Sequence, residues 1–180
     1  VSITIPESVC KIGDEAFADF DELQSVTVGD SVETIGNKAF VNCSKLESVK
    51  FGKSLWKIGA YAFIECEKLK SIVLPNNVKV ILTGAFDVCS CLSSVTLSTS
   101  MTEIPAEAFA GCMALTTVAL PQSVTSIGDN AFYDCSLLST ISLANVNHIG
   151  QSAFYDCRSL SEITLSDNLS VINDYAFKGC

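Results

Sequence analysis

Apolar residues recur along the whole chain with a period close to 23 residues. Every period carries a phenylalanine that follows an alanine directly and an isoleucine by five positions; these are Phe17, Phe40, Phe63, Phe86, Phe109, Phe132, Phe154 and Phe177. The spacing is 23 residues except for one step of 22, between Phe132 and Phe154. A period kept over the full length predicts a stack of equivalent coils. We therefore expect residues 1–180 to form one array of about 7.5 repeats.

Two apolar pairs in each period predict short extended segments. After Phe132, Ile141 and Leu143 alternate with polar residues, as in a strand with one buried face. Before Phe132, Val124 and Ile127 form the second pair. Equivalent strands of successive coils should lie side by side in a parallel sheet. We place the missing residue of the 22-residue step in the turn after Leu143, because a turn loses one residue more easily than a strand.

The segment around each phenylalanine follows helical spacing. Ile127, Ala131, Cys135 and Leu138 would share one stripe of a helix of about two turns. Polar residues precede these segments and are candidate N-caps; they are Asp14, Asn37, Thr83, Asp129 and Asp174. Helices are wider than strands, so the stack should curve with the sheet inside. The predicted fold class is thus α/β, a curved solenoid with a parallel β-sheet on the concave face and short helices on the convex face.

Seven of the nine cysteines occupy one position of the repeat, three residues after the phenylalanine; they are Cys43, Cys66, Cys89, Cys112, Cys135, Cys157 and Cys180. At an apolar position a thiol behaves as a small buried hydrophobe. Stacked strands about 4.8 Å apart would permit disulfides between neighbouring coils. A pairwise bond would break the equivalence of the coils, however, so we expect free thiols. Cys89 and Cys91 lack the C-x-x-C spacing of a zinc site.

The repeat L-x-x-V-x-L-P-x-x-V-x-x-I-G-x-x-A-F-x-x-C, read from Leu115 to Cys135, resembles the BspA-like leucine-rich repeat family. The resemblance covers the full chain. It implies a right-handed solenoid of the kind found on surface proteins of anaerobic bacteria and mucosal protists. It also implies a cell-surface or secreted location and adhesion to host matrix, host cell-surface or microbial surface proteins. Since the chain starts and stops inside a repeat, we expect it to be a fragment of a longer array.

The outward residues of the predicted sheet form the first candidate binding surface, which we call the strand face. Its side chains are small and mostly carry hydroxyls: Ser25, Thr27, Ser48, Lys50, Ser71, Val73, Ser94, Thr96, Thr117, Ala119, Thr140, Ser142, Glu162 and Thr164. Such a surface suits hydrogen bonds to a protein or a glycan. Serine and threonine are equally compatible with a solvated sheet that binds nothing.

Charge is distributed unevenly along the chain. The net charge is −9, yet residues 38–79 hold eight lysines and three acids. These lysines and the single tryptophan define a second candidate surface, the basic patch, formed by Lys50, Lys53, Trp56, Lys57, Lys70 and Lys79. Trp56 occupies a position that is polar in the other repeats, which favours a partner contact. A tryptophan packed under lysine stems is the alternative. Nucleic acid is excluded as a partner because phosphate binding needs a dominant basic surface.

The sequence offers little for catalysis. His148 is the only histidine, and the thiols that could act as nucleophiles point into the predicted core. We therefore predict a non-enzymatic module without cofactor or metal, and the chain has no run of 18 apolar residues that could span a membrane. The expected function is protein interaction or adhesion through the strand face. A structural spacer, or an intracellular scaffold that keeps its thiols reduced, are the alternatives.

Overall fold

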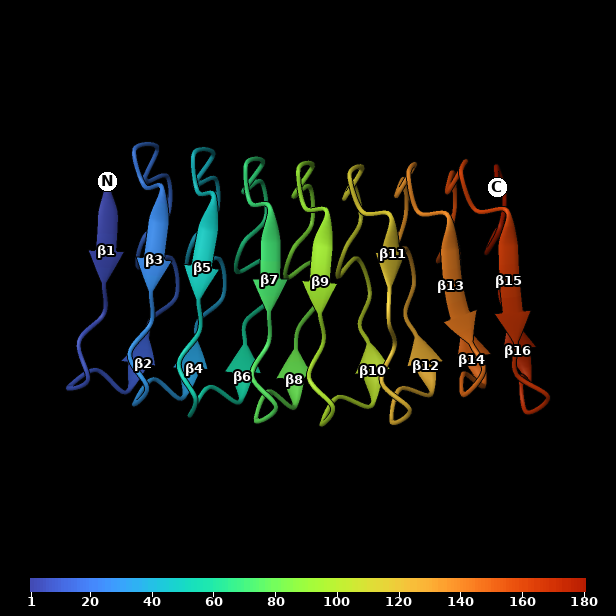
Figure 1. The fold of residues 1–180 in the computed structure, drawn as a ribbon, viewed down its shortest axis with the longest axis horizontal. Helices are drawn as coiled ribbons and strands as arrows, with labels where there is room; N and C mark the ends of the chain where they lie inside the picture. The colour runs from blue at the N-terminus through green and yellow to red at the C-terminus, as the bar shows by residue number, and fades with distance from the viewer.

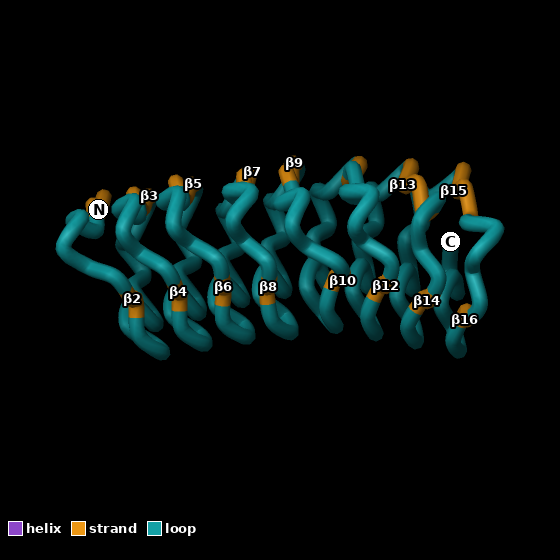
Figure 2. Tube along the Cα trace, turned by 90° about the horizontal axis from the view of Figure 1, so that it is seen from below, coloured by secondary structure: helices purple, strands orange, loops and turns teal.

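The chain folds into eight stacked coils, each of which contributes two short strands. A computed structural model describes residues 1–180, and Figure 1 shows the coils in a row with the termini at opposite ends. The longer strands run down the front of Figure 1, and the shorter ones run up behind them as the chain advances toward its C-terminus; Figure 2 separates the two layers. This sense of winding makes the solenoid right-handed.

The first strand of each coil belongs to the strand face. These strands are β1 (Ser2–Thr4), β3 (Ser25–Thr27), β5 (Ser48–Lys50), β7 (Ser71–Val73), β9 (Ser94–Thr96), β11 (Thr117–Val118), β13 (Thr140–Leu143) and β15 (Glu162–Leu165). All pairs are parallel, and they form a five-stranded sheet up to β9 followed by a three-stranded sheet. The second residue of each strand faces the core, as the alternation predicts.

The second strand of each coil has only two residues. These strands are β2 (Lys11–Ile12), β4 (Thr34–Ile35), β6 (Lys57–Ile58), β8 (Val80–Ile81), β10 (Glu103–Ile104), β12 (Ser126–Ile127), β14 (His148–Ile149) and β16 (Val171–Ile172). They form two four-stranded parallel sheets that are separated between β8 and β10. Pro105 explains this break: Gly59 and Gly128, at equivalent positions, donate backbone N–H groups to the preceding coil, and proline has none to donate.

The predicted helices are wrong. The residues around each phenylalanine form tight turns, and the structure contains no helix (Figure 2). We call this side of the solenoid the turn face; it comprises the residues from two before to two after each phenylalanine. The first and last of these residues have left-handed backbone in every coil, as at Glu107 (φ 58°) and Gly111 (φ 66°). A left-handed residue every fourth position interrupts a right-handed helix before one turn is complete.

Backbone hydrogen bonds on the turn face run from coil to coil. Glu107, Phe109 and Gly111 donate their N–H groups to the carbonyls of Asp129, Ala131 and Tyr133, at 2.7 to 2.9 Å. The same three bonds recur at all seven junctions between coils. Both sheets are interrupted along the stack, whereas this ladder is not. The left-handed residues are what aim these donors along the solenoid axis, so the ladder replaces the bonds that a helix would have made within itself.

Three of the five predicted N-caps join neighbouring coils instead. The Asp14 and Asn37 side-chain oxygens accept the backbone N–H groups of Asn37 and Ala60, at 2.8 and 2.9 Å. Asp129 accepts that of Gln151 at 2.7 Å. With no helix to cap, each of these three side chains accepts the backbone N–H of the equivalent position one coil further along. The helix-capping role predicted for these positions is therefore wrong.

The curvature expected from the sequence depended on the helices. Backbone hydrogen bonds join the coils in both layers of strands and on the turn face, so no layer of helices widens one side of the solenoid. The row of coils bends little in either view (Figures 1 and 2). The strand face is accordingly a nearly flat surface rather than the inside of a horseshoe.

The phenylalanines form one internal column, as the period predicts. Successive rings from Phe17 to Phe177 stack with centroids 5.0 to 5.8 Å apart and planes within 15° of parallel. The six central rings are fully buried, and they belong to a single core of 50 buried residues. The shortened step is also where it was expected, because β13 runs to Leu143 and pairing resumes at Ser126 with His148.

Close approach of the coils explains the glycine that stands four residues before the phenylalanine in several repeats. A Cβ on Gly36 would lie 2.5 Å from the backbone nitrogen of Asp14, and one on Gly59 would lie 2.4 Å from the Gly36 carbonyl carbon. Neither residue has a positive φ. Glycine is therefore used here for the space that it leaves to the preceding coil, and not for left-handed backbone.

Candidate functional site

The structure brings all fourteen predicted strand-face residues onto one surface. Pairing aligns Ser25, Ser48, Ser71 and Ser94 in one row, and Thr117, Thr140 and Glu162 continue that row along the second sheet. Ser25 and Thr27 are half-buried and the other twelve are exposed. The surface is therefore continuous in space, although its residues lie 22 or 23 positions apart in the chain.

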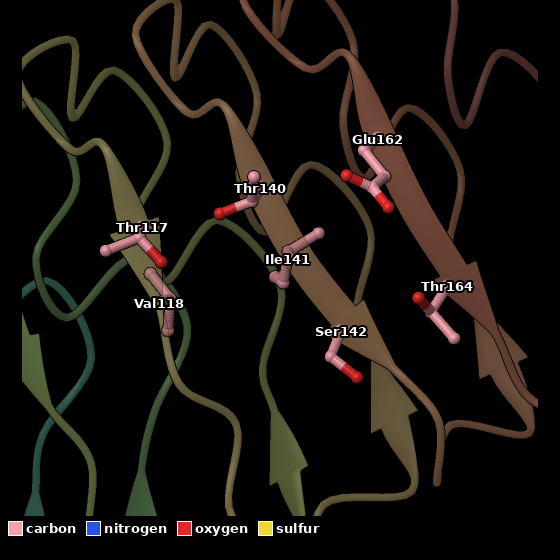
Figure 3. Close-up of a pocket in the computed structure, with 7 residues that line it drawn as sticks. All are labelled: Thr117, Val118, Thr140, Ile141, Ser142, Glu162 and Thr164. Atoms are coloured by element: carbon pink, nitrogen blue, oxygen red, sulfur yellow. The ribbon is translucent and has the colours of Figure 1, made fainter.

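A shallow hollow of about 290 Å³ lies over the C-terminal part of the strand face. Figure 3 shows Thr140 and Ser142 on β13 between Thr117 of β11 and two residues of β15, Glu162 and Thr164. Val118 and Ile141, which are almost fully buried, complete the lining. Hydroxyl groups and one carboxylate around an open hollow suit hydrogen bonds to an extended chain or a sugar, and nothing in it resembles a catalytic constellation.

A second hollow, of about 330 Å³, lies near the middle of the strand face. Its lining is apolar and basic: Val49, Lys50, Phe51, Lys53, Val73 and Pro75. Val73 is 62% exposed, the largest fraction among the apolar side chains of the surface. Lysines around an exposed valine differ from the hydroxyl groups further along, so the strand face has two regions of distinct chemistry.

The predicted basic patch is divided in space. Lys50 and Lys53 line the central hollow, whereas Trp56 and Lys57 line another hollow of about 220 Å³ beside the second strands. Trp56 is 41% exposed. The ring therefore remains available to solvent, but it does not share a hollow with Lys50 or Lys53.

Two lysines of the basic patch already have acidic partners. Lys53 Nζ lies 2.6 Å from Asp30 Oδ2, and Lys70 Nζ lies 2.6 Å from Glu47 Oε2, each one coil away. The hydrogen bond from Lys53 holds the pKa of Asp30 below its ordinary value. These pairs are exposed to solvent and add little stability. They do neutralise part of the positive charge that the sequence suggests, which leaves Lys50, Lys57 and Lys79 without an ion-pair partner.

All nine cysteines are free thiols. The seven that stand three residues after a phenylalanine of the repeat, which we call the ladder cysteines, make a contact that the sequence did not suggest. The Sγ of each ladder cysteine donates to the carbonyl of the phenylalanine one coil earlier, for example Cys112 to Phe86 at 3.3 Å. Burial raises the pKa of the Cys43 thiol to about 11 and that of Cys157 to about 12. These thiols stay protonated at neutral pH and are poor nucleophiles.

His148 and Cys91 lie in separate surroundings. His148 Nε2 is 3.4 Å from Asn173 Nδ2, with no thiol or hydroxyl partner. Cys91 is exposed whereas Cys89 is buried, and no group of three histidine, cysteine or acidic side chains is arranged to hold a metal ion. No segment of the structure forms a helix that could cross a bilayer.

The sequence analysis missed a group of aromatic and acidic side chains on the turn face. Tyr133 stacks on Tyr155 with centroids 5.0 Å apart, and the Tyr61 hydroxyl donates to Glu107 Oε2 at 2.8 Å, two coils away. Burial, together with the charge of Glu107, raises the pKa of Asp87 to about 6. A helix would have scattered these positions. The only sequence signal for them was Asp87, an acidic residue at a position that is apolar in most other repeats.

Right-handed winding, parallel short strands and columns of leucine, isoleucine and phenylalanine define a leucine-rich repeat solenoid. The model of the BspA type leucine rich repeat region matches the chain over residues 1–103 and 56–180, in six copies. The chain therefore belongs to the BspA-type leucine-rich repeat family. A search of the curated proteins finds no match.

Several solved structures share this architecture. A leucine-rich repeat protein of T. pallidum superposes with a TM-score of 0.82 at 28% identity, over 89% of this chain and 78% of its own. A leucine-rich cell surface protein of Faecalibacterium prausnitzii A2-165 gives 0.83 at 35% identity, over 94% of this chain and 48% of its own. One of Bacteroides ovatus gives 0.73 at 26% identity, over 99% and 64%. The chain thus spans about half to three-quarters of these relatives.

Proposed function

We propose that this chain is a non-enzymatic binding module of a cell-surface or secreted protein, and that it contacts other proteins through the strand face. One observation carries the proposal. The outward side chains of seven adjacent coils form a single, nearly flat and largely exposed surface with two shallow hollows. A flat surface of this extent matches a macromolecular partner better than a small substrate, which is usually held in a deep apolar cavity.

The proposal of a non-enzymatic role rests on the state of the reactive side chains. The ladder thiols are buried and protonated, and His148 lies beside an amide. A catalytic nucleophile needs a base within hydrogen-bond reach. Neither group meets that condition, so both are better explained by packing.

A surface location is supported by a relative. The F. prausnitzii protein, 35% identical, is described as a cell surface protein. The free thiols favour the intracellular scaffold instead, because reduced cysteines persist most easily in the cytosol. Burial protects most of these thiols from oxidation, however, so a surface location remains compatible with them. Labelling of intact cells with a membrane-impermeant reagent distinguishes the two locations.

Binding through the strand face is tested with a matched pair of variants. Thr140→Arg places a bulky cation in the C-terminal hollow, whereas Thr125→Arg places the same side chain at an exposed position outside the strand face. We expect the first variant to weaken binding to a panel of immobilised matrix proteins (fibronectin, laminin and collagen) by at least tenfold. The second should leave binding unchanged. Equal effects of the two variants on a panel member that binds the wild type would contradict the proposal.

The basic patch is tested separately because its lysines line different hollows. Lys50→Glu and Lys57→Glu reverse charge in the central hollow and beside Trp56, respectively. If the central hollow carries the contact to an acidic partner, only Lys50→Glu weakens binding to the same panel. A loss with Lys57→Glu alone would move the contact to Trp56. If changing Lys50, Lys53 and Lys57 together to glutamate leaves binding intact, the basic patch takes no part.

A structural spacer is the second candidate, and the uninterrupted ladder of the turn face favours it. Every coil is joined to the next by the same three backbone hydrogen bonds, and the phenylalanine column runs from end to end. Such a stack would hold two attached domains at a constant distance. A folded chain that binds no protein of the panel, but keeps two fused fluorescent domains at one fixed separation, would favour the spacer over the binding module.

A further inference from the structure

We infer that a hollow on the turn face binds the cationic end of an arginine or lysine side chain from a protein partner. The hollow measures about 290 Å³ and is lined by Asp87, Glu107, Ala110, Asn130 and Tyr133. These residues come from three successive coils, and none belongs to the strand face. The site is therefore additional to the proposed binding surface and does not depend on it.

The hollow results from the order of side chains in one column of the turn face. Asp87, Ala110 and Tyr133 directly follow the column phenylalanines of three successive coils. The middle residue is small and buried, so a gap remains between the carboxylate on one side and the aromatic ring on the other. Glu107 and Asn130, each two residues before a column phenylalanine, line the adjoining edge of the hollow.

The carboxylates of this hollow lack a positive partner. The chain's four ion pairs are made by lysines and an arginine elsewhere, and none includes Asp87 or Glu107. Glu107 accepts a hydrogen bond from the neutral Tyr61 hydroxyl, which leaves its charge in place. The Asn130 side chain makes no hydrogen bond to the rest of the chain. A cation entering the hollow would meet two uncompensated acids and a free amide oxygen.

The Tyr133 ring supplies an aromatic wall. One face of Tyr133 stacks on Tyr155, and the side chain is 39% exposed beside the hollow. Aromatic faces attract cations within about 6 Å of the ring centroid. The chain already contains such a contact, because Lys178 Nζ lies 5.4 Å from the Tyr155 centroid. A cation in the hollow would occupy the corresponding place at the other end of the Tyr133–Tyr155 pair.

Arginine fits this combination better than lysine. A guanidinium group is flat, stacks on an aromatic ring and donates to carboxylates through several N–H groups at once. The hollow offers a ring and two carboxylates in one place. A primary ammonium group would satisfy the charge but not the stacking, so lysine should bind more weakly.

Binding should depend on pH. Burial and the nearby charges of Glu107 and Glu65 raise the pKa of Asp87 to about 6, while Tyr61 donates a hydrogen bond to the Glu107 carboxylate. Below that pH the hollow loses one of its two negative charges. Affinity for a cation should therefore fall as the pH is lowered from 7.5 to 5.

The experiment uses a peptide of three arginines separated by glycines, and the same peptide with citrulline, which is neutral and nearly the same shape, as the control. Titrations followed by NMR should shift the Asn130 side-chain amide and the Ala110 backbone amide with the arginine peptide and not with citrulline. Asp87→Asn and Tyr133→Leu should each weaken binding at least tenfold. Glu103→Gln removes the same charge from an exposed site on β10 and should leave affinity unchanged.

Three results would overturn the inference: equal binding of the citrulline peptide, an equal loss with Glu103→Gln, or shifts confined to the strand face. Circular dichroism establishes whether each variant is folded. If Tyr133→Leu does not fold, the affinity of Asp87→Asn for the arginine peptide tests the inference. Strand-face binding to the protein panel is measured independently, so failure here leaves that proposal unaffected.

Discussion

Each ladder cysteine joins two coils as well as filling the core. The Cys112 thiol donates to the Phe86 carbonyl at 3.3 Å, and the same bond recurs at seven positions along the stack. Burial alone would be satisfied by alanine or valine. The hydrogen bond explains why the repeat uses a side chain that is both apolar and a weak donor.

This contact changes the cost expected for Cys112→Ser. From sequence alone, an unpaired hydroxyl in the core would cost about 1–3 kcal/mol. The Phe86 carbonyl gives the hydroxyl an acceptor, so we expect a loss near the lower end, about 1 kcal/mol, from the smaller volume and a longer contact. Chemical denaturation measures the change in the free energy of unfolding. A loss above about 3 kcal/mol would mean that the hydroxyl is left unpaired after all.

Asp87 should make the stability of the chain depend on pH. Its pKa is about 6 in the folded chain against an ordinary value of 3.8, so the folded state binds the proton more tightly than the unfolded state. Ionised Asp87 thus destabilises the fold above pH 6, and the penalty is relieved as the pH falls from about 7 to 4.

Asp87→Asn should therefore raise the free energy of unfolding at pH 7.5, by on the order of 1–3 kcal/mol. The gain should shrink on acidification and vanish near pH 4, where the wild-type side chain is neutral in both states. Thermal unfolding of both proteins across this range measures it. A gain independent of pH would show that the charge of Asp87 is not its source.

At the scale of one element, the turn segments show how neighbouring coils override local preference. Asp134, Asn42 and Gly111 occupy the second left-handed position in their coils, and these residue types tolerate that backbone well. Val88 stands at the same position with φ 55°, which a β-branched residue adopts only under constraint. Its N–H still donates to Ala110 at 2.8 Å, so the ladder holds the strained backbone in place.

Val88→Asn should stabilise the chain by about 1 kcal/mol, because asparagine visits the left-handed region at lower cost. Val41→Asn is the matched control: Val41 is also half-buried on the turn face but has no positive φ. That substitution should destabilise the chain, since it loses apolar burial and relieves nothing. The melting temperatures of the two variants should move in opposite directions. A fall for both would mean that burial outweighs backbone strain at Val88.

For the whole molecule, stability depends on contacts between adjacent coils, so position along the stack matters. Phe109 is fully buried between Phe86 and Phe132, whereas Phe177 has one stacked neighbour and is only partly buried. In a repeat array each coil is stabilised mainly by its immediate neighbours. A defect in the middle therefore weakens two interfaces, and a defect at the last coil weakens one.

Phe109→Ala should cost about 3–5 kcal/mol, from lost burial and the cavity left behind. Phe177→Ala should cost clearly less, and Ser93→Ala, at an exposed position, at most about 1 kcal/mol for its hydrogen bond to Lys70. Denaturant unfolding of the three variants measures these losses. Equal losses for Phe109→Ala and Ser93→Ala would contradict the internal column.

Much of the strand face could be predicted from sequence, and the turn-face hollow could not. Alternation along each strand determines which side chains point outward, so Thr117, Thr140 and Glu162 were placed correctly. The basic patch was grouped by sequence proximity, and the structure separates Lys50 from Trp56 because the chain turns a corner between them. Asp87 and Tyr133 are 46 positions apart and meet only because the intervening coil presents alanine.

The sequence by itself determined the period, the columns of the core and the family of the fold. It did so because buried side chains that recur every 22 or 23 residues have to return to the same place beside their equivalents. The conformation of the turn face was decided only by the tertiary structure. Residues such as Glu107 and Lys38 have no preference for left-handed backbone and fit a helix equally well, so the local sequence pointed to one. The hydrogen-bond acceptors in the next coil, which exist only once the coils are stacked, selected the turns instead.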